Sequence, residues 1–534
     1  AESRNITLRV MGTYGAALGP HSVSLVAGYE QNQSDNSNVS ASRQSTYSND
    51  LQEVSAGDAS LQTTGGSSGA SRLRSVFGRF SYNFGDRYLF EANARYDGSS
   101  RFAKGNRFGF FPSFSVGWRI SEESFFPETN VLNELKLRAS WGRTGNQNIG
   151  NYEHWQTVSF TGNYVFGGSL QQGAAITSLA NPDISWETTT MRNFGVDAVL
   201  FGGKLSFTGD AYRNLTEGLL LSMVMPRTLG LGNTVRENAG KLENRGWELG
   251  LAWRDQWGDL GYNIGLNLYD NRNMVLDLAG NPPNISGRSL TAEGYPLGTM
   301  WGYEAIGLFR DEADVASHAD QSGISPDFGP GDIKFRDLNG DGVIRPEDDR
   351  TVIGNELPRY TIGSTIGLNW RGFDLSLFLQ GVLQVDAYIE GALTEGPVWE
   401  NFTTREWLDR WTPENPNPNA KRPKPALQKH HNHGQVSSFW VQDVSYIKLK
   451  NAQIGYTFRR SPSTDEPLAQ RSVFNRIASY LPVLNFQQMR VYVSGQNLLS
   501  FTNDALFLDP EFPSGRGTVY PQTRTISVGT SIQF

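Results

Sequence analysis

The chain contains 534 residues, among them 58 glycines, 12% aromatic residues and no cysteine, and its net charge is −7. The acidic balance argues against a nucleic-acid-binding protein, because such proteins usually carry a basic surface. The lack of cysteine excludes a disulfide scaffold, and the lack of any apolar stretch near the ~18 residues of a spanning helix excludes a helical membrane bundle. These exclusions favour an all-β protein.

Strict alternation of apolar and polar residues recurs along the chain and predicts β-strands, because successive side chains of a strand point to opposite faces. Residues 88–97 and 205–212 show the pattern, and the end of the chain alternates down to Phe534. The pattern predicts about 15 strands, at 4–14, 22–32, 74–84, 88–99, 108–120, 135–144, 190–201, 204–216, 245–255, 259–271, 359–370, 373–385, 445–458, 489–499 and 523–534.

These strands have the lengths and faces of membrane-spanning strands. Most are close to the ~9–11 residues that a tilted strand needs to cross a bilayer. Their apolar faces often begin or end in an aromatic residue such as Tyr88 or Trp370, as rings at the headgroup level do. The opposite faces carry charges such as Glu91, Asp210 and Asp374, which suit a wet lumen.

The connections between the strands alternate between short and long. Tight polar turns are predicted at 85–87, 202–203, 256–258 and 371–372, and long loops at 33–73, 145–189, 217–244, 272–358 and 386–444. Outer-membrane barrels have short periplasmic turns and long extracellular loops. The fold predicted is therefore a transmembrane antiparallel β-barrel of the outer membrane with long extracellular loops.

The odd strand count has a further consequence. Bacterial single-chain barrels have an even number of strands, since both chain ends lie in the periplasm. With the tight turns placed in the periplasm, the first and last predicted strands both run toward it. We therefore expect residues 1–534 to form the C-terminal portion of a larger barrel and not to close alone.

The loop 272–358 contains an EF-hand-like cation motif at 337–348. Side-chain oxygens at the first, third and fifth positions, a glycine at the sixth, a carbonyl at the seventh and a carboxylate at the twelfth are the Ca²⁺ ligands and turn of such a loop. The corresponding ligands here are Asp337, Asn339, Asp341, Val343 and Asp348. The motif predicts a structural Ca²⁺ that braces the loop. The alternative is a turn-rich loop without an ion.

Other loop residues allow two interpretations each. His430, His431 and His433 form a tract that can bind metal, but no carboxylate pattern accompanies them in the sequence, so a solvated loop is the preferred interpretation. Aromatic residues of the long loops are candidates for a substrate-stacking surface, namely Trp155, Trp186, Trp301, Tyr303 and Trp399. The alternative is that these rings pack the loops against one another.

The sequence shows no machinery for catalysis. It contains no Gly-rich phosphate loop, no Gly-x-Ser-x-Gly elbow and no His-Glu-x-x-His helix, which are the motifs of several common enzyme classes. We therefore expect that the protein is not an enzyme.

Several motifs resemble the SusC/RagA family of TonB-dependent outer-membrane transporters, and they follow the order of that family along nearly the whole chain. They lie at residues 77–84, 96–102, 111–113, 117–119, 140–142, 144–147, 181–183, 186–187, 331–334, 446–451 and 495–499.

The resemblance implies a barrel of about 22 strands, filled by an N-terminal plug and energised through TonB. It also implies a SusD-like surface lipoprotein as partner in the import of glycan fragments or oligopeptides. The final Phe534 resembles the signal read by the barrel-assembly machinery. The plug, the TonB box and about seven strands are not among these residues, so we expect them on a separate polypeptide, on a part that has been cleaved off, or outside the sequence in hand.

Two other classes of protein remain as alternatives. A passive porin-like or adhesive outer-membrane barrel would also have long external loops and a cation site. A soluble carbohydrate-binding β-protein is a third interpretation, which the strand lengths disfavour.

Overall fold

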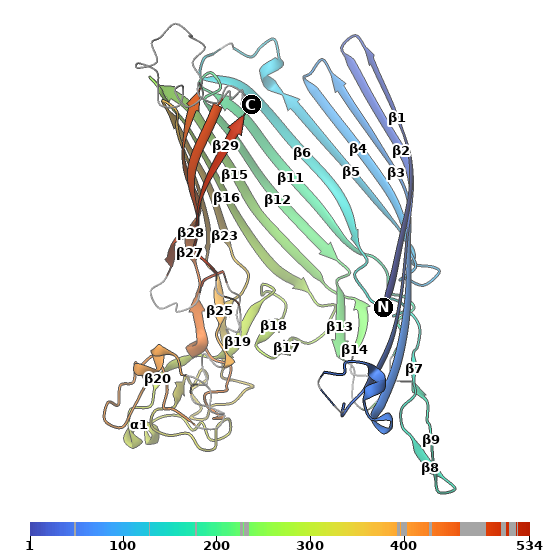
Figure 1. Cartoon of the computed structure of the whole chain (residues 1–534), viewed down its shortest axis with the longest axis vertical. Coiled ribbons are helices and arrows are strands. Elements are labelled where there is room, and N and C mark those ends of the chain that lie inside the picture. The colour runs from blue at the N-terminus through green and yellow to red at the C-terminus, as the bar shows by residue number, and fades with distance from the viewer. Residues whose placement is uncertain are drawn as a thin grey trace.

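The computed structural model describes residues 1–46, 48, 50–127, 129–176, 179–224, 228, 234–391, 396, 403–426, 430–459, 488–502, 509–511, 520 and 522–533. A single antiparallel sheet of 15 strands dominates them and forms a curved wall (Figure 1). Its strands follow one another in chain order, β1-β2-β3-β4-β5-β6-β11-β12-β15-β16-β23-β24-β27-β28-β29. The predicted fold class and the number of strands are therefore confirmed.

Apart from β2 and β3, which are much longer than predicted, the observed strands have bounds close to those predicted from alternation. They are β1 (Glu2–Leu18), β2 (His21–Arg43), β3 (Gln62–Phe84), β4 (Tyr88–Ser99), β5 (Phe108–Arg119), β6 (Leu132–Asn146), β11 (Glu187–Leu200), β12 (Leu205–Glu217), β15 (Lys241–Trp257), β16 (Leu260–Asp277), β23 (Tyr360–Trp370), β24 (Phe373–Leu383), β27 (Tyr446–Arg459), β28 (Gln488–Thr502) and β29 (Thr525–Gln533).

The pairing register separates an apolar face from a polar one. Phe194 of β11 lies opposite Ala211 of β12, and Val528 of β29 lies opposite Val493 of β28. Opposed residues share a face of the sheet, so these pairs extend one continuous apolar surface. Phe194 is 54% exposed and Val528 is 73% exposed. An apolar surface of this extent requires an apolar environment, and the lipid bilayer supplies it.

The predicted tight turns lie at one end of the sheet and the longest connections at the other (Figure 1). The turn between β23 and β24 consists of Arg371 and Gly372, both with positive φ, at 46° and 90°. Two successive residues of positive φ match the right-handed twist of the flanking strands. This geometry explains why a glycine follows Arg371.

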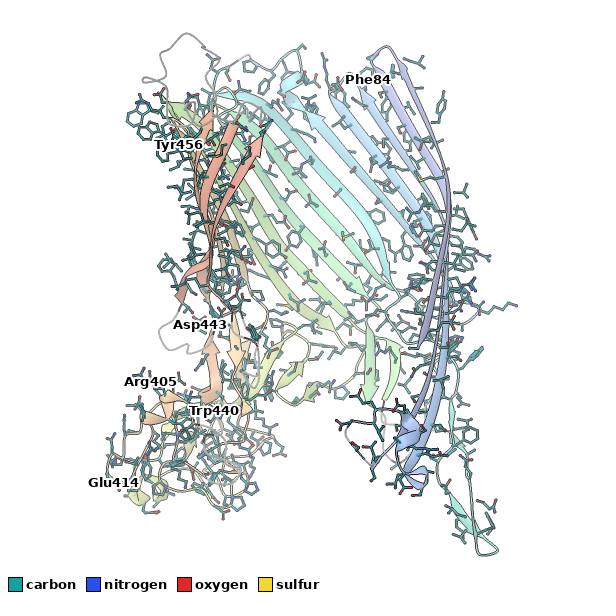
Figure 2. The ribbon with its side chains drawn as sticks, viewed as in Figure 1. Phe84, Arg405, Glu414, Trp440, Asp443 and Tyr456 are labelled. Carbon is teal, nitrogen blue, oxygen red and sulfur yellow. The ribbon has the colours of Figure 1, made fainter. Side chains whose placement is uncertain are left out.

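Aromatic rings surround the tight turns. Phe84 stacks on Tyr88 across the turn between β3 and β4, and Phe373 contacts Tyr456, with centroids 6.3 and 4.6 Å apart. Phe84 and Tyr456 lie at the same end of the wall in Figure 2. Rings in this position mark the height of the lipid headgroups.

The segment predicted as the loop 33–73 is mostly strand. β2 continues to Arg43 and pairs in unbroken register with β3, which begins at Gln62. Both faces of this extension are rich in Ser, Asn, Gly and Thr, so it lacks the one-sided alternation that revealed the spanning strands. Backbone pairing with the neighbouring strand keeps it extended without an apolar face, and only residues 44–61 connect the two strands.

Among the described residues, the long connections contain short strands, short 3-10 helices and one α-helix. Two-stranded pairs are β7 (Val158–Ser159) with β10 (Ala175–Ile176), β8 (Tyr164–Phe166) with β9 (Ser169–Gln171), β13 (Leu220–Val224) with β14 (Thr234–Asn238), β20 (Ala305–Leu308) with β21 (Ile333–Phe335), and β25 (Asp386–Tyr388) with β26 (Val441–Asp443). A four-stranded sheet joins β17 (Asn284–Ser286), β18 (Ser289–Thr291), β19 (Thr299–Tyr303) and β22 (Arg350–Asn355), and α1 spans Glu312–Ala316. In the part of the chain that the structure describes, no helix is long and apolar enough to cross a membrane.

The two longest loops, 272–358 and 386–444, fold together into one external body below the wall (Figure 1). Its core contains buried residues from both loops, namely Met300, Tyr303, Leu308, Ile333, Phe335, Ile344, Tyr388, Trp411, Ala420 and Trp440. This core is separate from the sheet that spans the membrane.

The sheet is open. Among the described residues, β1 is hydrogen-bonded only to β2 and β29 only to β28. Both edges therefore present unpaired backbone N–H and C=O groups.

A lipid-facing charge should destabilise the wall. We expect Phe194→Arg to cost about 2–4 kcal/mol, because an arginine at mid-bilayer on the lipid face carries that penalty. The measurement is urea unfolding of the membrane-inserted assembly. The matched control is Asn193→Arg, one residue earlier on the polar face, for which a shift below about 1 kcal/mol is expected. Equal losses for the two variants would contradict the assignment of the faces.

Candidate functional site

Two buried side-chain amides assemble the external body around β21. Asn432 accepts a hydrogen bond from the Ile333 backbone N–H at 2.8 Å and donates to its C=O at 2.9 Å. Gln321 accepts from Phe335 N–H at 2.8 Å and donates to Ile333 C=O at 3.1 Å. Both amides are fully buried. Since Asn432 belongs to the second loop and Ile333 to the first, the pair fixes the two loops to each other.

Aromatic packing completes this body and explains Tyr303. The ring of Tyr303 is fully buried and lies 5.0 Å from the ring of Phe335. The Tyr303 backbone N–H donates to Val436 C=O at 2.8 Å, again across the two loops. Tyr303 was a candidate for substrate stacking, but the structure gives its ring no free face. Of the two interpretations from the sequence, loop packing describes this residue.

The cation motif forms a tight turn stabilised by its own carboxylates. Asp337 accepts hydrogen bonds from Gly340 N–H at 2.7 Å and from Gly342 N–H at 2.8 Å. Asn339 accepts from Asp341 N–H at 3.0 Å, and Asp341 accepts from Val343 N–H at 2.9 Å. The side chains at the first, third and fifth positions therefore each accept a hydrogen bond from a backbone N–H of the same turn.

The twelfth position of the motif differs from the expectation. Asp348 is exposed, whereas its neighbour Asp349 is fully buried. Asp349 turns back into the loop and accepts from the N–H groups of Leu338 at 2.8 Å and Arg345 at 2.7 Å. A buried carboxylate that closes both ends of the motif is a feature that the sequence spacing did not reveal.

The electrostatics of the turn favour an ionised carboxylate. The backbone N–H of Gly342, and to a smaller extent that of Gly340, lowers the pKa of Asp337 below its usual value. Hydrogen bonds to the charged form stabilise that form. An ionised carboxylate, an amide oxygen and a backbone carbonyl are hard oxygen ligands, and this donor set suits Ca²⁺.

The polar face of the sheet carries cross-strand ion pairs. Arg138 of β6 donates to Asp197 of β11 at 2.8 Å and to Asp210 of β12 at 2.9 Å. Hollows of about 510 and 810 Å³ lie on this face, the first beside Arg138 and the second beside Asp210. Paired charges beside water-accessible hollows are what the predicted lumen requires.

The remaining aromatic candidates do not form one site. Trp155 is 62% exposed and stacks on Tyr152. Trp186 instead packs against Phe102, and its indole N–H donates to Arg107 C=O at 2.9 Å. Trp301, on β19, contacts Tyr295 edge-on.

Two further candidates, Trp399 and Phe534, lie outside the described residues. Of the five stacking candidates, Trp155 thus has the most exposed ring among those that the structure describes.

A curved antiparallel sheet with an apolar outer face, a charged inner face, tight turns at one end and long loops at the other defines an integral β-barrel protein of the outer membrane. A family model for the TonB dependent receptor-like β-barrel matches residues 3–383. The chain belongs to the TonB-dependent receptor family.

Relatives and solved structures agree with this membership. The chain is 31% identical to TonB-dependent receptor P3 of Formosa agariphila, over 98% of this chain and 51% of that protein. It is 28% identical to TonB-dependent receptor SusC of Bacteroides thetaiotaomicron, over 89% of this chain and 45% of that protein. The fold is similar to a chain of the RagAB peptide transporter, with a TM-score of 0.80 and 24% identity over 100% of this chain and 56% of that one.

These similarities are of the SusC/RagA type, as the motifs in the sequence predicted. The chain spans about half the length of the curated relatives it matches.

Removal of the buried amide should loosen the external body. We expect Asn432→Ala to destabilise it by about 1–3 kcal/mol, because the buried Ile333 N–H loses its side-chain partner and the Ile333 C=O keeps only that of Gln321. Hydrogen–deuterium exchange of residues 330–336 measures the effect as a rise in exchange rate. Asn419→Ala, a change at an exposed residue of the same loop, is the control and should leave that exchange unchanged. Unaltered exchange in Asn432→Ala would contradict the role assigned to this amide.

Proposed function

We propose that this chain forms most of the wall and the external loops of a TonB-dependent transporter that imports nutrients across the outer membrane. The observation that carries the proposal is the open sheet of 15 strands, whose two edges have no second neighbour among the described residues. Unpaired backbone groups are too costly inside a bilayer to persist. The wall therefore needs further strands, and about seven would complete a transporter barrel of about 22 strands.

The remaining parts of the transporter follow from the family. The additional strands belong with a plug that fills the lumen and contacts TonB, whether on the same polypeptide or on another. The charged inner face, with Arg138, Asp197 and Asp210, lines the path that opens when the plug moves. Phe534 acts as the signal for the barrel-assembly machinery.

A SusD-like surface lipoprotein is the partner expected at the external loops. The external body and the extended β2–β3 hairpin both project beyond the wall at the loop end (Figure 1) and offer the surface for it. The substrate is a glycan fragment or an oligopeptide, and exposed rings such as Trp155 suit contact with either, because aromatic faces stack on sugars and on side chains.

Purification and uptake together test this function. The tagged chain should co-purify from detergent-solubilised outer membranes with a plug-bearing segment and a SusD-like lipoprotein in stoichiometric amounts, as identified by mass spectrometry. Uptake of labelled oligopeptides or glycans by whole cells should fall to background when TonB is deleted.

The main alternative, a passive porin-like or adhesive barrel, predicts a different result. In that case the chain would purify alone as a sealed barrel, and solute passage or surface adhesion would not depend on TonB. Either finding would overturn the transporter proposal.

We also propose that the turn at 337–348 holds a structural Ca²⁺ through Asp337, Asn339, Asp341, Val343 and Asp348. The support for the proposal is the hard oxygen donor set of this one turn, and the ion would draw the exposed Asp348 toward it. Its role is to brace the loop that leads out of β21.

A Ca²⁺ titration of the purified assembly tests this site. We expect Asp348→Asn to weaken Ca²⁺ binding by about tenfold or more, since affinity follows the number of charged ligands. The control is Glu347→Gln, an exposed neighbour outside the ligand set, which should bind as the unmodified protein does. No calorimetric binding in the unmodified protein would refute the site.

A further inference from the structure

Three metal-ligating side chains meet on the external body. Asp332 comes from the first long loop, and His430 and His433 come from the second. Their ligand atoms all lie within 4.8 Å of one another. Asp332 Oδ1 lies 2.9 Å from His433 Nε2 and 3.7 Å from His430 Nδ1.

These separations fit a common metal ion. Zn–N and Zn–O bonds of ~2.0–2.1 Å in a tetrahedron place ligand atoms about 3.3 Å apart. The two distances from Asp332 Oδ1 lie on either side of this value, so small side-chain movements would bring both histidines to the ion. The His430 and His433 rings lie side by side with centroids 4.6 Å apart.

Local structure explains why the two histidines converge. The chain turns between them, with Gly434 N–H donating to His430 C=O at 3.1 Å. The indole N–H of Trp440 donates a hydrogen bond to the backbone C=O of His433 at 3.0 Å. Trp440 lies within the external body in Figure 2. The turn and this anchor direct both rings to Asp332.

One nitrogen of the group has no hydrogen-bond partner among the residues that the structure describes. His430 Nδ1 is buried and makes no hydrogen bond within the described part of the chain. A buried polar atom without a partner is unfavourable, and buried polar atoms in folded proteins are nearly always satisfied. A metal ion bound between Asp332 and the two rings would satisfy this atom.

The second carboxylate oxygen of Asp332, Oδ2, has its own partners, and these orient the carboxylate for an ion at Oδ1. Asp332 is fully buried. Its Oδ2 lies 2.9 Å from Lys424 Nζ and accepts from Gly329 N–H at 2.8 Å. Outer contacts of this kind orient metal-binding carboxylates, and they leave Oδ1 toward the histidines. Without an ion the same residues form only an ion-pair cluster, which leaves His430 Nδ1 unexplained.

We propose that Asp332, His430 and His433 bind a zinc-type transition-metal ion that cross-links the two external loops. Imidazole with a carboxylate suits Zn²⁺. Three protein ligands leave a fourth position for water or for a group from a bound partner. This site is distinct from the Ca²⁺ turn and does not depend on the proposed transport.

Zinc binding to the purified assembly tests the proposal. The titration is made with ZnCl₂ against a competing fluorescent chelator, with Ca²⁺ in excess so that the turn at 337–348 is saturated. We expect one equivalent of Zn²⁺ per chain, and a visible absorption spectrum of low-symmetry Co²⁺ when cobalt replaces it. Hydrogen exchange at residues 328–336 should slow when the ion binds.

The decisive variant is His430→Ala. Because His430 Nδ1 makes no hydrogen bond to the described residues, loss of this ring should weaken Zn²⁺ binding by tenfold or more and leave the ion-free exchange pattern unchanged. The matched control is His431→Ala, an exposed residue next to it, which should bind as the unmodified protein does.

Three outcomes would overturn the proposal. The first is that the unmodified protein binds no stoichiometric zinc, and the second is that His430→Ala binds zinc as tightly as the unmodified protein. The third is that His431→Ala weakens zinc binding as much as His430→Ala does. If His430→Ala alters the ion-free exchange pattern, the variant no longer tests the site alone, and the cobalt spectrum of the unmodified protein then tests whether imidazole binds the ion. A spectrum identical to that of aqueous Co²⁺ would then exclude imidazole ligands and refute the site.

Discussion

Backbone hydrogen bonding in a bilayer is the constraint on which this structure depends. Lipid offers no partner to an N–H or C=O group, so each spanning segment must pair with neighbours on both sides. The inner strands of the wall meet this requirement through antiparallel pairing on both sides, interrupted by bulges in four of the strand pairs. β1 and β29 meet it on one side only among the described residues. Under the transporter proposal, additional strands pair with these two edges, and the lumen takes its shape only when they are present.

The same constraint is absent beyond the membrane, where water can satisfy the backbone. There the chain uses different means to hold its shape. The external body has an aromatic core, with Tyr303 and Phe335 in contact, and buried amides replace missing sheet neighbours. Asn432 pairs with both backbone groups of Ile333 as a neighbouring strand would. This allows two loops distant in sequence to form one rigid unit.

The sequence predicted the features that depend on residues close together in the chain. The spanning strands were predictable because each displays its own alternation, and β4 has the predicted bounds. The extension of β2 and β3 was not predictable, because polar residues on both faces resemble a loop. The role of Asp349 was missed because spacing pointed to Asp348. The meeting of Asp332 with His433 joins residues far apart in the chain, and only the packing of the two loops brings them together.

β21 connects these features physically. Asp332, beside the two histidines, directly precedes it, and Asp337, which begins the Ca²⁺ motif, follows it by two residues. The side chains of Gln321 and Asn432 accept hydrogen bonds from the backbone of β21 between these two positions. An ion bound at either end would therefore restrain the same short strand, and ordering one end lowers the entropy lost on ordering the other. If both proposed ions bind, their shared attachment to β21 predicts positive coupling between the two sites, without any contact between the ions.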